Sequence, residues 1–183
     1  MTEEQTLAYA NSYLKINYGG NWKLEISNAQ YFWNDDIPLK EIIVKSDGGN
    51  EGYLLVSTSK QTPFLITKAF HGDTLTDLLL KKAGVTLGNI TVTNNFVASL
   101  KFYYDPPFNF IIKNDAGLFI DVNDSFILKK TDVSFYLGVP EKNAAEISEE
   151  WLRLEDDQVI NPTSEIMHRS GPRYNQAYNS ACV

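Results

Sequence analysis

The sequence has few of the residues that form disulfide cross-links or bind metals. Its 183 residues include one cysteine and two histidines. A single cysteine excludes an internal disulfide, which suits the cytosol or an exported bacterial protein whose core needs no covalent support. The chain also lacks any stretch approaching about eighteen apolar residues, and this excludes a membrane-spanning helix.

Clustered positive charge is also missing. The 16 Lys and Arg residues are outnumbered by 23 Asp and Glu residues, and the net charge is -7. Nucleic-acid-binding proteins neutralise phosphates with clustered Lys and Arg, so we expect no nucleic-acid partner. An acidic surface instead suits solubility or a basic protein partner.

Length and apolar content predict a folded chain. Hydrophobic residues make up 43% of the sequence and aromatic residues 13%, enough for a sizeable core and too much for wholesale disorder. The length fits one domain, or one domain with a tail.

The first predicted element is a helix that begins after Thr2. Thr2 and Gln5 have the spacing of a capping box, in which each side chain satisfies the other residue's backbone amide. The pair Gly19 and Gly20 predicts its end. Apolar residues three or four positions apart form its expected core face, at Leu7, Ala10 and Leu14.

Alternating and continuous apolar runs then predict a largely β chain. Asp47 to Asn50 is a strong turn signal between two of these runs, and the runs on either side predict an antiparallel pair. Their continuous apolar character predicts central strands that are covered well. The expected strands span residues 22–33, 38–45, 52–59, 64–67, 90–93, 96–104, 108–113, 118–122 and 125–129.

Two further helices are expected. A short one is capped by Asp73 or Thr74 and ends at Gly84. The other lies in residues 141–157, which carry seven acids against two bases, and Pro140 could occupy its first turn. We expect a solvated helix that Trp151 pins to the protein, or alternatively a tether lying on a partner domain. Together these elements predict an α+β fold with an N-terminal helix packed on a twisted antiparallel sheet, a second short helix and an acidic helical segment near the C-terminus.

The stretch from Gly171 to Val183 contains the only cysteine, Cys182, with Gln176 six positions before it. A lone cysteine is most often a small buried apolar group. Here the residues before it are polar and show no apolar periodicity, so the context favours an accessible and reactive thiol.

This stretch resembles the nucleophile region of papain-like cysteine peptidases, above all the streptopain-type and bacteriocin-leader-type enzymes, in the run Tyr174–Gln176 and in Cys182. The resemblance implies that Cys182 is the nucleophile and that Gln176 helps to form the oxyanion hole, with no cofactor and no metal. The family's catalytic histidine lies downstream of its cysteine, whereas His71 and His168 both precede Cys182. We therefore expect this chain alone to be catalytically incomplete.

The order of the predicted elements is similar to that of streptopain-type prosegments. Those prosegments begin with a helix and continue with a sheet, in which a Gly-aromatic-hydrophobic-Val-Ser strand precedes a strand that opens after a proline. Gly52–Ser57 and Pro63–Thr67 match this order. The resemblance implies three parts: a prosegment-like α+β domain over 1–138, an acidic helix and linker over 139–165, and the start of a truncated catalytic domain over 166–183.

Other candidate sites are incomplete as motifs. Asp121, Asn123 and Asp124 are spaced as in a calcium loop, but the glycine and the distal glutamate of that loop are missing, so we expect no metal site. His71 near Asp73 could form a base–orienter pair, and a loop histidine before a helix cap is the simpler interpretation.

Two aromatic clusters, Tyr31–Trp33 and Phe102–Tyr104, could form a platform that stacks on sugars. Alternating burial in a sheet explains both clusters more simply. The carbohydrate-binding hypothesis requires Trp33 to be exposed.

The hypothesis that follows from the sequence is a prosegment of a bacterial cysteine peptidase, serving as an inhibitor or a folding aid. Its partner would be its own catalytic domain or another protein. The first alternative is an acidic, non-enzymatic binding protein of the immunity or inhibitor kind, and the second is a carbohydrate-binding surface domain. The resemblance implies a secreted or cell-surface protein. The start at Met1 lacks the basic-then-apolar pattern of a secretion signal, which fits a cytoplasmic protein or a trimmed signal.

Overall fold

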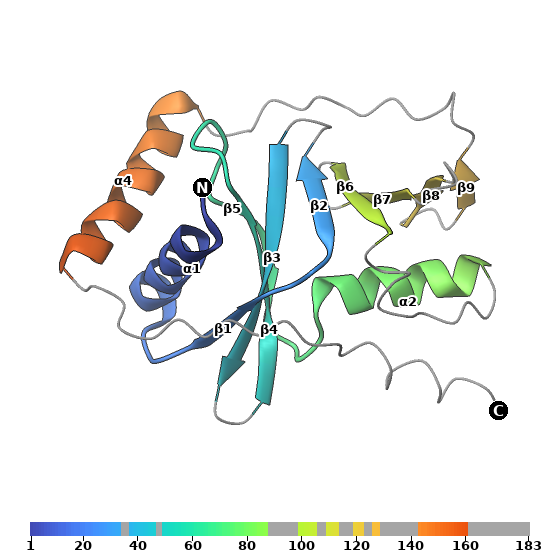
Figure 1. Ribbon diagram of the computed structural model, residues 1–183, viewed down its shortest axis with the longest axis horizontal. Helices are drawn as coiled ribbons and strands as arrows, with labels where there is room; N and C mark the ends of the chain where they lie inside the picture. The colour runs from blue at the N-terminus through green and yellow to red at the C-terminus, as the bar shows by residue number, and fades with distance from the viewer. Residues whose placement is uncertain are drawn as a thin grey trace. The chain divides into compact units, whose positions relative to one another are not determined.

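The computed structural model describes residues 1–33, 37–46, 49–87, 99–105, 109–113, 119–122, 126–128 and 143–160, and confirms the α+β class (Figure 1). Contacts divide the chain into two compact units. The first unit contains α1 (Glu3–Tyr18), β1 (Lys23–Ile26), β3 (Ile37–Ser46), β4 (Gly49–Ser57), β5 (Leu65–Ala69) and α4 (Ala144–Ile160). The second contains β2 (Gln30–Trp33), α2 (Leu75–Leu87), β6 (Lys101–Asp105), β7 (Asn109–Lys113), β8 (Phe119–Asp121) and β9 (Phe126–Leu128). The domain boundaries predicted from the sequence stay predictions.

Helix α1 begins and ends as its sequence predicts. The Thr2 hydroxyl accepts a hydrogen bond from the Gln5 amide at 3.2 Å, and the Gln5 side chain accepts one from the Thr2 amide at 2.9 Å. Gly19 ends the helix with a positive φ of 67°, and its amide donates to the Lys15 carbonyl. The predicted core face is confirmed, because Leu7, Ala10 and Leu14 are buried.

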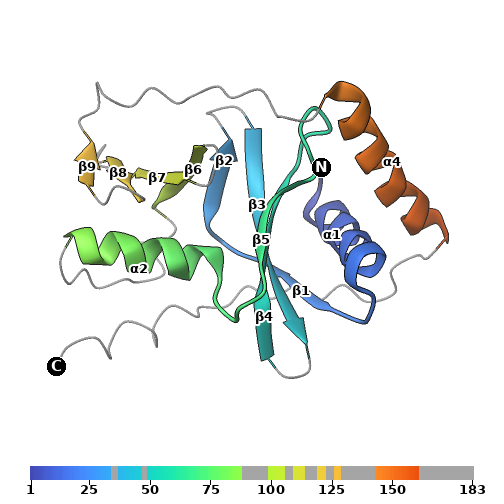
Figure 2. The same ribbon diagram turned by 180° about the vertical axis from the view of Figure 1, so that it is seen from behind.

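The first unit contains an antiparallel sheet in the order β1–β3–β4–β5. Its central strands β3 and β4 are buried on both faces, which explains their continuous apolar runs. One face joins the core under α1 and α4, with contributions from Leu24, Ile42, Val44, Leu54 and Val56. Figure 2 shows β3, β4 and β5 running alongside α1.

Helix α4 packs against α1 through a buried stripe of Ile147, Trp151 and Leu154. The Trp151 indole donates to the Thr62 carbonyl at 2.9 Å, and its ring meets Tyr9 and Phe64 edge-on, at centroid distances of 5.4 and 5.2 Å. The expectation that Trp151 pins this acidic helix to the protein is confirmed.

The start of α4 differs from the expectation that Pro140 occupies the first turn. The helix begins at Ala144 because Asn143 caps it: the Glu146 amide donates to the Asn143 side chain at 3.0 Å, and that side chain donates back to the Glu146 carboxylate. Pro140 itself lies outside the described residues.

The second unit shows that the prediction of a wholly antiparallel sheet was wrong. Strands β6 to β9 pair antiparallel in sequence order, but β2 pairs with β6 in parallel. The register places Tyr31 opposite Phe102, Phe32 opposite Tyr103 and Trp33 opposite Tyr104. The two aromatic clusters are therefore partners in one ladder, with ring centroids 4.9, 5.5 and 5.7 Å apart. Far-separated aromatic segments make favourable cross-strand pairs, and sequence periodicity carries no information on such pairing.

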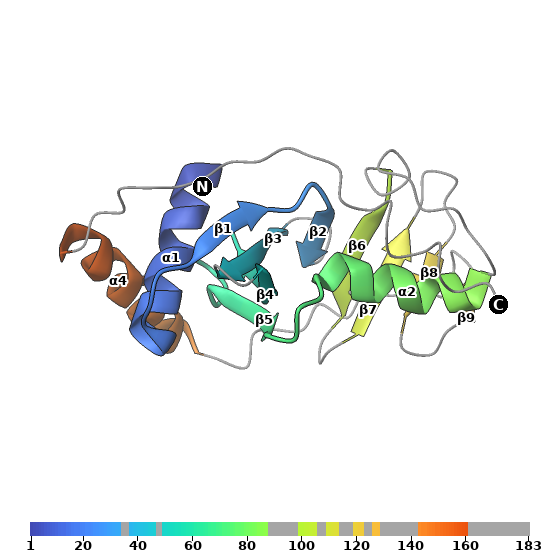
Figure 3. The ribbon, with the colours of Figure 1, turned by 90° about the horizontal axis from the view of Figure 1, so that it is seen from below.

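Helix α2 lies against these strands, as the views from the front and from below agree (Figure 3). The Tyr31 hydroxyl and the Thr76 hydroxyl are 2.8 Å apart and buried, which joins β2 to α2. The helix runs through Gly84 to Leu87, so the predicted end at Gly84 was wrong. A glycine inside a helix costs only about 1 kcal/mol, which tertiary packing overrides.

The remaining strand predictions fall into four groups. Strand β6 begins at Lys101, later than the predicted strand over 96–104, and residues 96–98 lie outside the described residues. Strands β3, β4, β5, β7, β8 and β9 lie where they were expected, within a few residues. The predicted strand over 22–33 is divided into β1 and β2, because the chain leaves the first strand at Ser27, whose amide donates to the Glu41 carbonyl at 2.9 Å. The predicted strand over 90–93 lies outside the described residues.

We expect Trp151→Ala to lower the free energy of unfolding by about 3–5 kcal/mol, because it removes a buried ring and leaves a cavity. The control is Leu152→Ala on the same helix, where the side chain is 57% exposed. That substitution should change the free energy by less than about 0.5 kcal/mol. Urea unfolding followed by circular dichroism measures both, and equal losses would contradict the assigned burial.

Gly52 is predicted to tolerate no side chain. A Cβ at this position would lie 1.9 Å from the Ala69 carbonyl oxygen, on a backbone with φ 159°. Gly52→Ala should therefore destabilise the protein by about 3 kcal/mol or more, because backbone atoms must move. Gly19→Ala is the control: its φ is also positive, but its Cβ would meet nothing within 4 Å, so it should cost about 1–2 kcal/mol. A smaller loss for Gly52→Ala than for Gly19→Ala, in the same urea measurement, would contradict this close approach.

Candidate functional site

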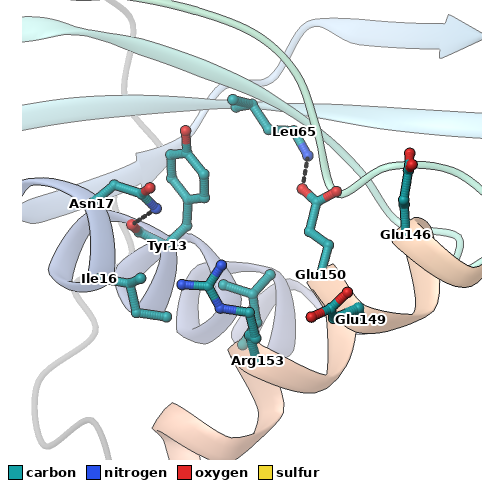
Figure 4. A pocket seen from close by; sticks show the side chains of 9 residues that line it. Tyr13, Ile16, Asn17, Leu65, Glu146, Glu149, Glu150 and Arg153 are labelled. Atoms are coloured by element: carbon teal, nitrogen blue, oxygen red, sulfur yellow. Dashed lines mark hydrogen bonds between the residues drawn. The ribbon is translucent and has the colours of Figure 1, made fainter. Parts of the chain in front are cut away.

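A groove of about 450 Å³ opens in the first unit between α1, α4 and the start of β5 (Figure 4). Helix α1 contributes one wall, α4 the other, and β5 one residue between them. The lining residues are Tyr13, Ile16, Asn17, Leu65, Glu146, Glu149, Glu150, Arg153 and Leu154. The size of this groove falls within the range of about 300–1,000 Å³ that is usual for ligand pockets.

The α4 wall is acidic. Helical spacing places Glu146, Glu149, Glu150 and Arg153 on the side that borders the groove. The Glu150 carboxylate accepts a hydrogen bond from the Leu65 amide at 3.4 Å, so the acidic wall also contacts the beginning of β5 (Figure 4). Three carboxylates against one guanidinium give this wall a net negative charge.

The α1 wall is formed around Tyr13. Lys68 of β5 donates to the Tyr13 hydroxyl at 2.9 Å and also to the Tyr18 hydroxyl. Its ammonium lies 5.4 and 4.9 Å from the two ring centroids. Burial raises the pKa of Tyr13, and the hydrogen bond from Lys68 opposes that shift. The same hydrogen bonds raise the pKa of Lys68, so this ammonium stays charged and engaged.

Three aromatic side chains lie beside the α1 wall and next to one another. We call them the aromatic patch: Tyr18, Trp22 and Phe70. Tyr18 is 45% exposed and Phe70 39% exposed. Phe70 lies between the other two, with centroids 5.1 Å from Tyr18 and 6.3 Å from Trp22. Tyr13 is 6.4 Å from Tyr18, so the patch and the groove adjoin.

Glu155 joins α4 to Tyr9 and Lys60. Its carboxylate accepts hydrogen bonds from the Tyr9 hydroxyl at 3.1 Å and from the Lys60 ammonium. The Lys60 hydrogen bond lowers the pKa of Glu155, burial opposes this shift, and the Tyr9 hydroxyl adds to it. Burial and the bond to Glu155 raise the pKa of Tyr9.

The site residues expected from the peptidase resemblance are outside this region. Gln176 and Cys182, and also His168, lie outside the described residues. His71 lies in the connection between β5 and α2, where it is 46% exposed with its Nδ1 3.9 Å from the Asp73 carboxylate. This placement agrees with a loop histidine before a helix.

The calcium-loop candidate is only partly described. Asp121 ends β8, and Asn123 and Asp124 lie outside the described residues. Within the described ranges, no group of three potential metal-ligating side chains occurs. In those same ranges, no helix is long and apolar enough to cross a membrane.

The two aromatic clusters do not form an open platform for sugars. Tyr31, Phe102 and Tyr103 are buried, and Trp33 is only 6% exposed. The simpler interpretation, alternating burial in a sheet, is therefore the one that the structure favours. A carbohydrate-binding role that depends on an exposed Trp33 loses its physical basis.

The groove and the aromatic patch were not predicted from the sequence. A signal was present in α1, where Ile16 and Tyr18 lie outside the core face set by Leu7, Ala10 and Leu14 and are exposed. The opposite wall gave no such signal, because acidic residues on a surface helix are ordinary.

Known proteins give no further guide to this region: no family model, curated protein or solved structure matches the chain.

We expect Glu155→Gln to weaken the dependence of stability on acid pH. The folded-state pKa of Glu155 lies below its ordinary value of 4.5, so its stabilisation is complete above that value and is lost as pH falls through the folded-state pKa. The loss at neutral pH should be small, because the ion pair is solvent-accessible and screened.

Urea unfolding between pH 3 and pH 7, at about one-unit steps, measures this change against the pH slope that linkage predicts. Asp156→Asn, at an exposed position on the same helix, is the matched control and should keep the slope of the unaltered protein. An unchanged slope for Glu155→Gln would contradict the role given to this carboxylate.

Proposed function

We propose that this chain is the non-catalytic prosegment of a papain-like cysteine peptidase, which assists the folding of that enzyme and blocks it until cleavage. The resemblance supports this proposal in the order of helix, sheet and the two strand motifs. In the structure those motifs are β4 and β5, which pair antiparallel next to α1.

The close approach of the chain to Gly52 is the observation that carries most weight. Only glycine fits at this position of β4, because the Ala69 carbonyl of the neighbouring strand β5 lies against it. The glycine of the Gly-aromatic-hydrophobic-Val-Ser pattern therefore has a physical reason, and the strand that follows Pro63 supplies it. We propose that the same packing constraint explains the glycine of the family's pattern.

The roles proposed for Cys182 and Gln176 follow from the same resemblance, as nucleophile and as oxyanion-hole residue. A cysteine needs a base and a residue that orients the base to act as a nucleophile. Both histidines of this chain precede Cys182, in the opposite order to that of the family. A prosegment of this kind would be secreted or held at the cell surface.

A second candidate is an acidic inhibitor or immunity protein that blocks a basic partner. The acidic wall of the groove favours it, together with the net charge of -7. This protein could be cytoplasmic. The two candidates share a binding role and differ in whether a catalytic domain belongs to the same polypeptide.

The isolated chain should not hydrolyse casein or a fluorogenic peptide. A nucleophile without its base leaves no efficient route to the acyl-enzyme. The measurement compares the purified chain with Cys182→Ala under reducing conditions. Hydrolysis that the Cys182→Ala substitution abolishes would overturn the proposal of a non-catalytic prosegment.

Reading the gene beyond the codon for Val183 separates the two candidates. The prosegment proposal expects an open frame that encodes a histidine and then an Asn or Asp partner, in the order of the family. A stop codon at that point would contradict it and favour the acidic inhibitor.

A further inference from the structure

We propose that the groove and the aromatic patch together bind an extended segment of a partner protein, in which a Lys or Arg stands beside a bulky apolar residue. The basic side chain would enter the groove along α4, and the apolar one would lie on the aromatic patch. This inference does not depend on the peptidase resemblance, because it rests on the surface of the first unit alone.

The aromatic patch supplies the apolar part of this surface. Tyr18 and Phe70 are exposed, and Trp22 beside them is partly buried against the core. Adjoining exposed rings mark interaction sites on soluble proteins, and Tyr, Trp and Phe are enriched in the cores of such interfaces. The Trp22 indole donates to the Gly19 carbonyl at 2.7 Å, and Phe70 contacts both neighbouring rings. These contacts fix the rings before binding, so a partner loses little free energy in ordering them.

Charge selects the partner. The groove carries three carboxylates, and Arg153 is the basic residue among those that line it. Lys68, at the junction with the patch, already donates to two tyrosine hydroxyls. A cationic side chain is therefore attracted to the α4 wall, whereas an anionic one would meet Glu146, Glu149 and Glu150.

We do not expect a partner strand to pair with the beginning of β5, because the backbone there is already hydrogen-bonded. Among the described strands, β5 pairs with β4 alone and is thus an edge strand. Glu150 accepts the hydrogen bond of the Leu65 amide, which an added strand would otherwise compete for. Recognition therefore depends on side chains that reach the groove and the patch, and less on backbone pairing.

Two short synthetic peptides test this proposal on the full chain. In the first, lysines flank a tryptophan in a glycine–serine background; in the second, glutamates replace the lysines. Titration of the ¹⁵N-labelled protein, followed by amide chemical shifts, should show saturable binding of the lysine peptide. The shifts should concentrate around Tyr13–Tyr18, Leu65–Phe70 and Glu146–Leu154. Absence of binding, or equal binding of the glutamate peptide, would overturn the proposal.

Three substitutions, two that change a charge in the groove and one that removes a ring from the aromatic patch, test which side chains bind the peptide. Glu149→Lys should weaken binding of the lysine peptide by about threefold or more, and Arg153→Ala should strengthen it by about threefold, the size expected for exposed charges. Phe70→Ala should weaken it by about tenfold, as expected for an aromatic contact residue. Thermal melting of each variant checks that it is folded.

Asp156→Lys is the matched control. It makes the same charge change on the same helix, at an exposed position that does not line the groove. It should leave the affinity unchanged. If it weakens binding as much as Glu149→Lys does, the attraction is a diffuse effect of the net charge and the groove is not the binding site.

Discussion

The first unit depends on the burial of Trp151. Helix α4, which carries it, has six acids in seventeen residues, and such a helix has little reason to fold alone, because like charges repel. The indole offsets this cost by packing between Tyr9 and Phe64 and by donating to the Thr62 carbonyl. One ring thereby holds an acidic helix against the body of the protein, and the groove exists because that helix is there.

The other constraint is that β3 and β4 are covered on both faces. Buried side chains on each side of these strands leave little of the sheet surface open to a ligand. The end of β5 also lies against β4 at backbone contact distance beside Gly52. In the first unit, the groove and the aromatic patch are consequently formed at the margin of the sheet, by α1, α4 and β5. This is where binding would occur in either candidate function, and neither requires a catalytic group there.

Local signals in the sequence predicted local structure well. The capping box of Thr2 and Gln5 and the positive φ of Gly19 set the limits of α1, because cap geometry involves only residues within one turn. The antiparallel pair around residues 47–50 followed from turn chemistry in the same way. Prediction failed where distant residues decide. Parallel pairing of β2 with β6 joins Tyr31 to Phe102, far away in sequence. Helix α2 continues through Gly84, because a single glycine lowers helix propensity by only about 1 kcal/mol.

The candidate site likewise combines local features that the sequence shows with contacts that only the fold creates. The sequence by itself determined an excess of acidic residues and a helix, α1, with a defined cap and a defined core face. Only the tertiary structure decided that Glu149 and Glu150 face Tyr13 across a groove, and that Phe70 lies between Tyr18 and Trp22. The reason is physical. Residue type and spacing set which side chains share a face of one element, but which faces meet is decided by the burial of Trp151 and by sheet register, and both join residues that no local pattern connects.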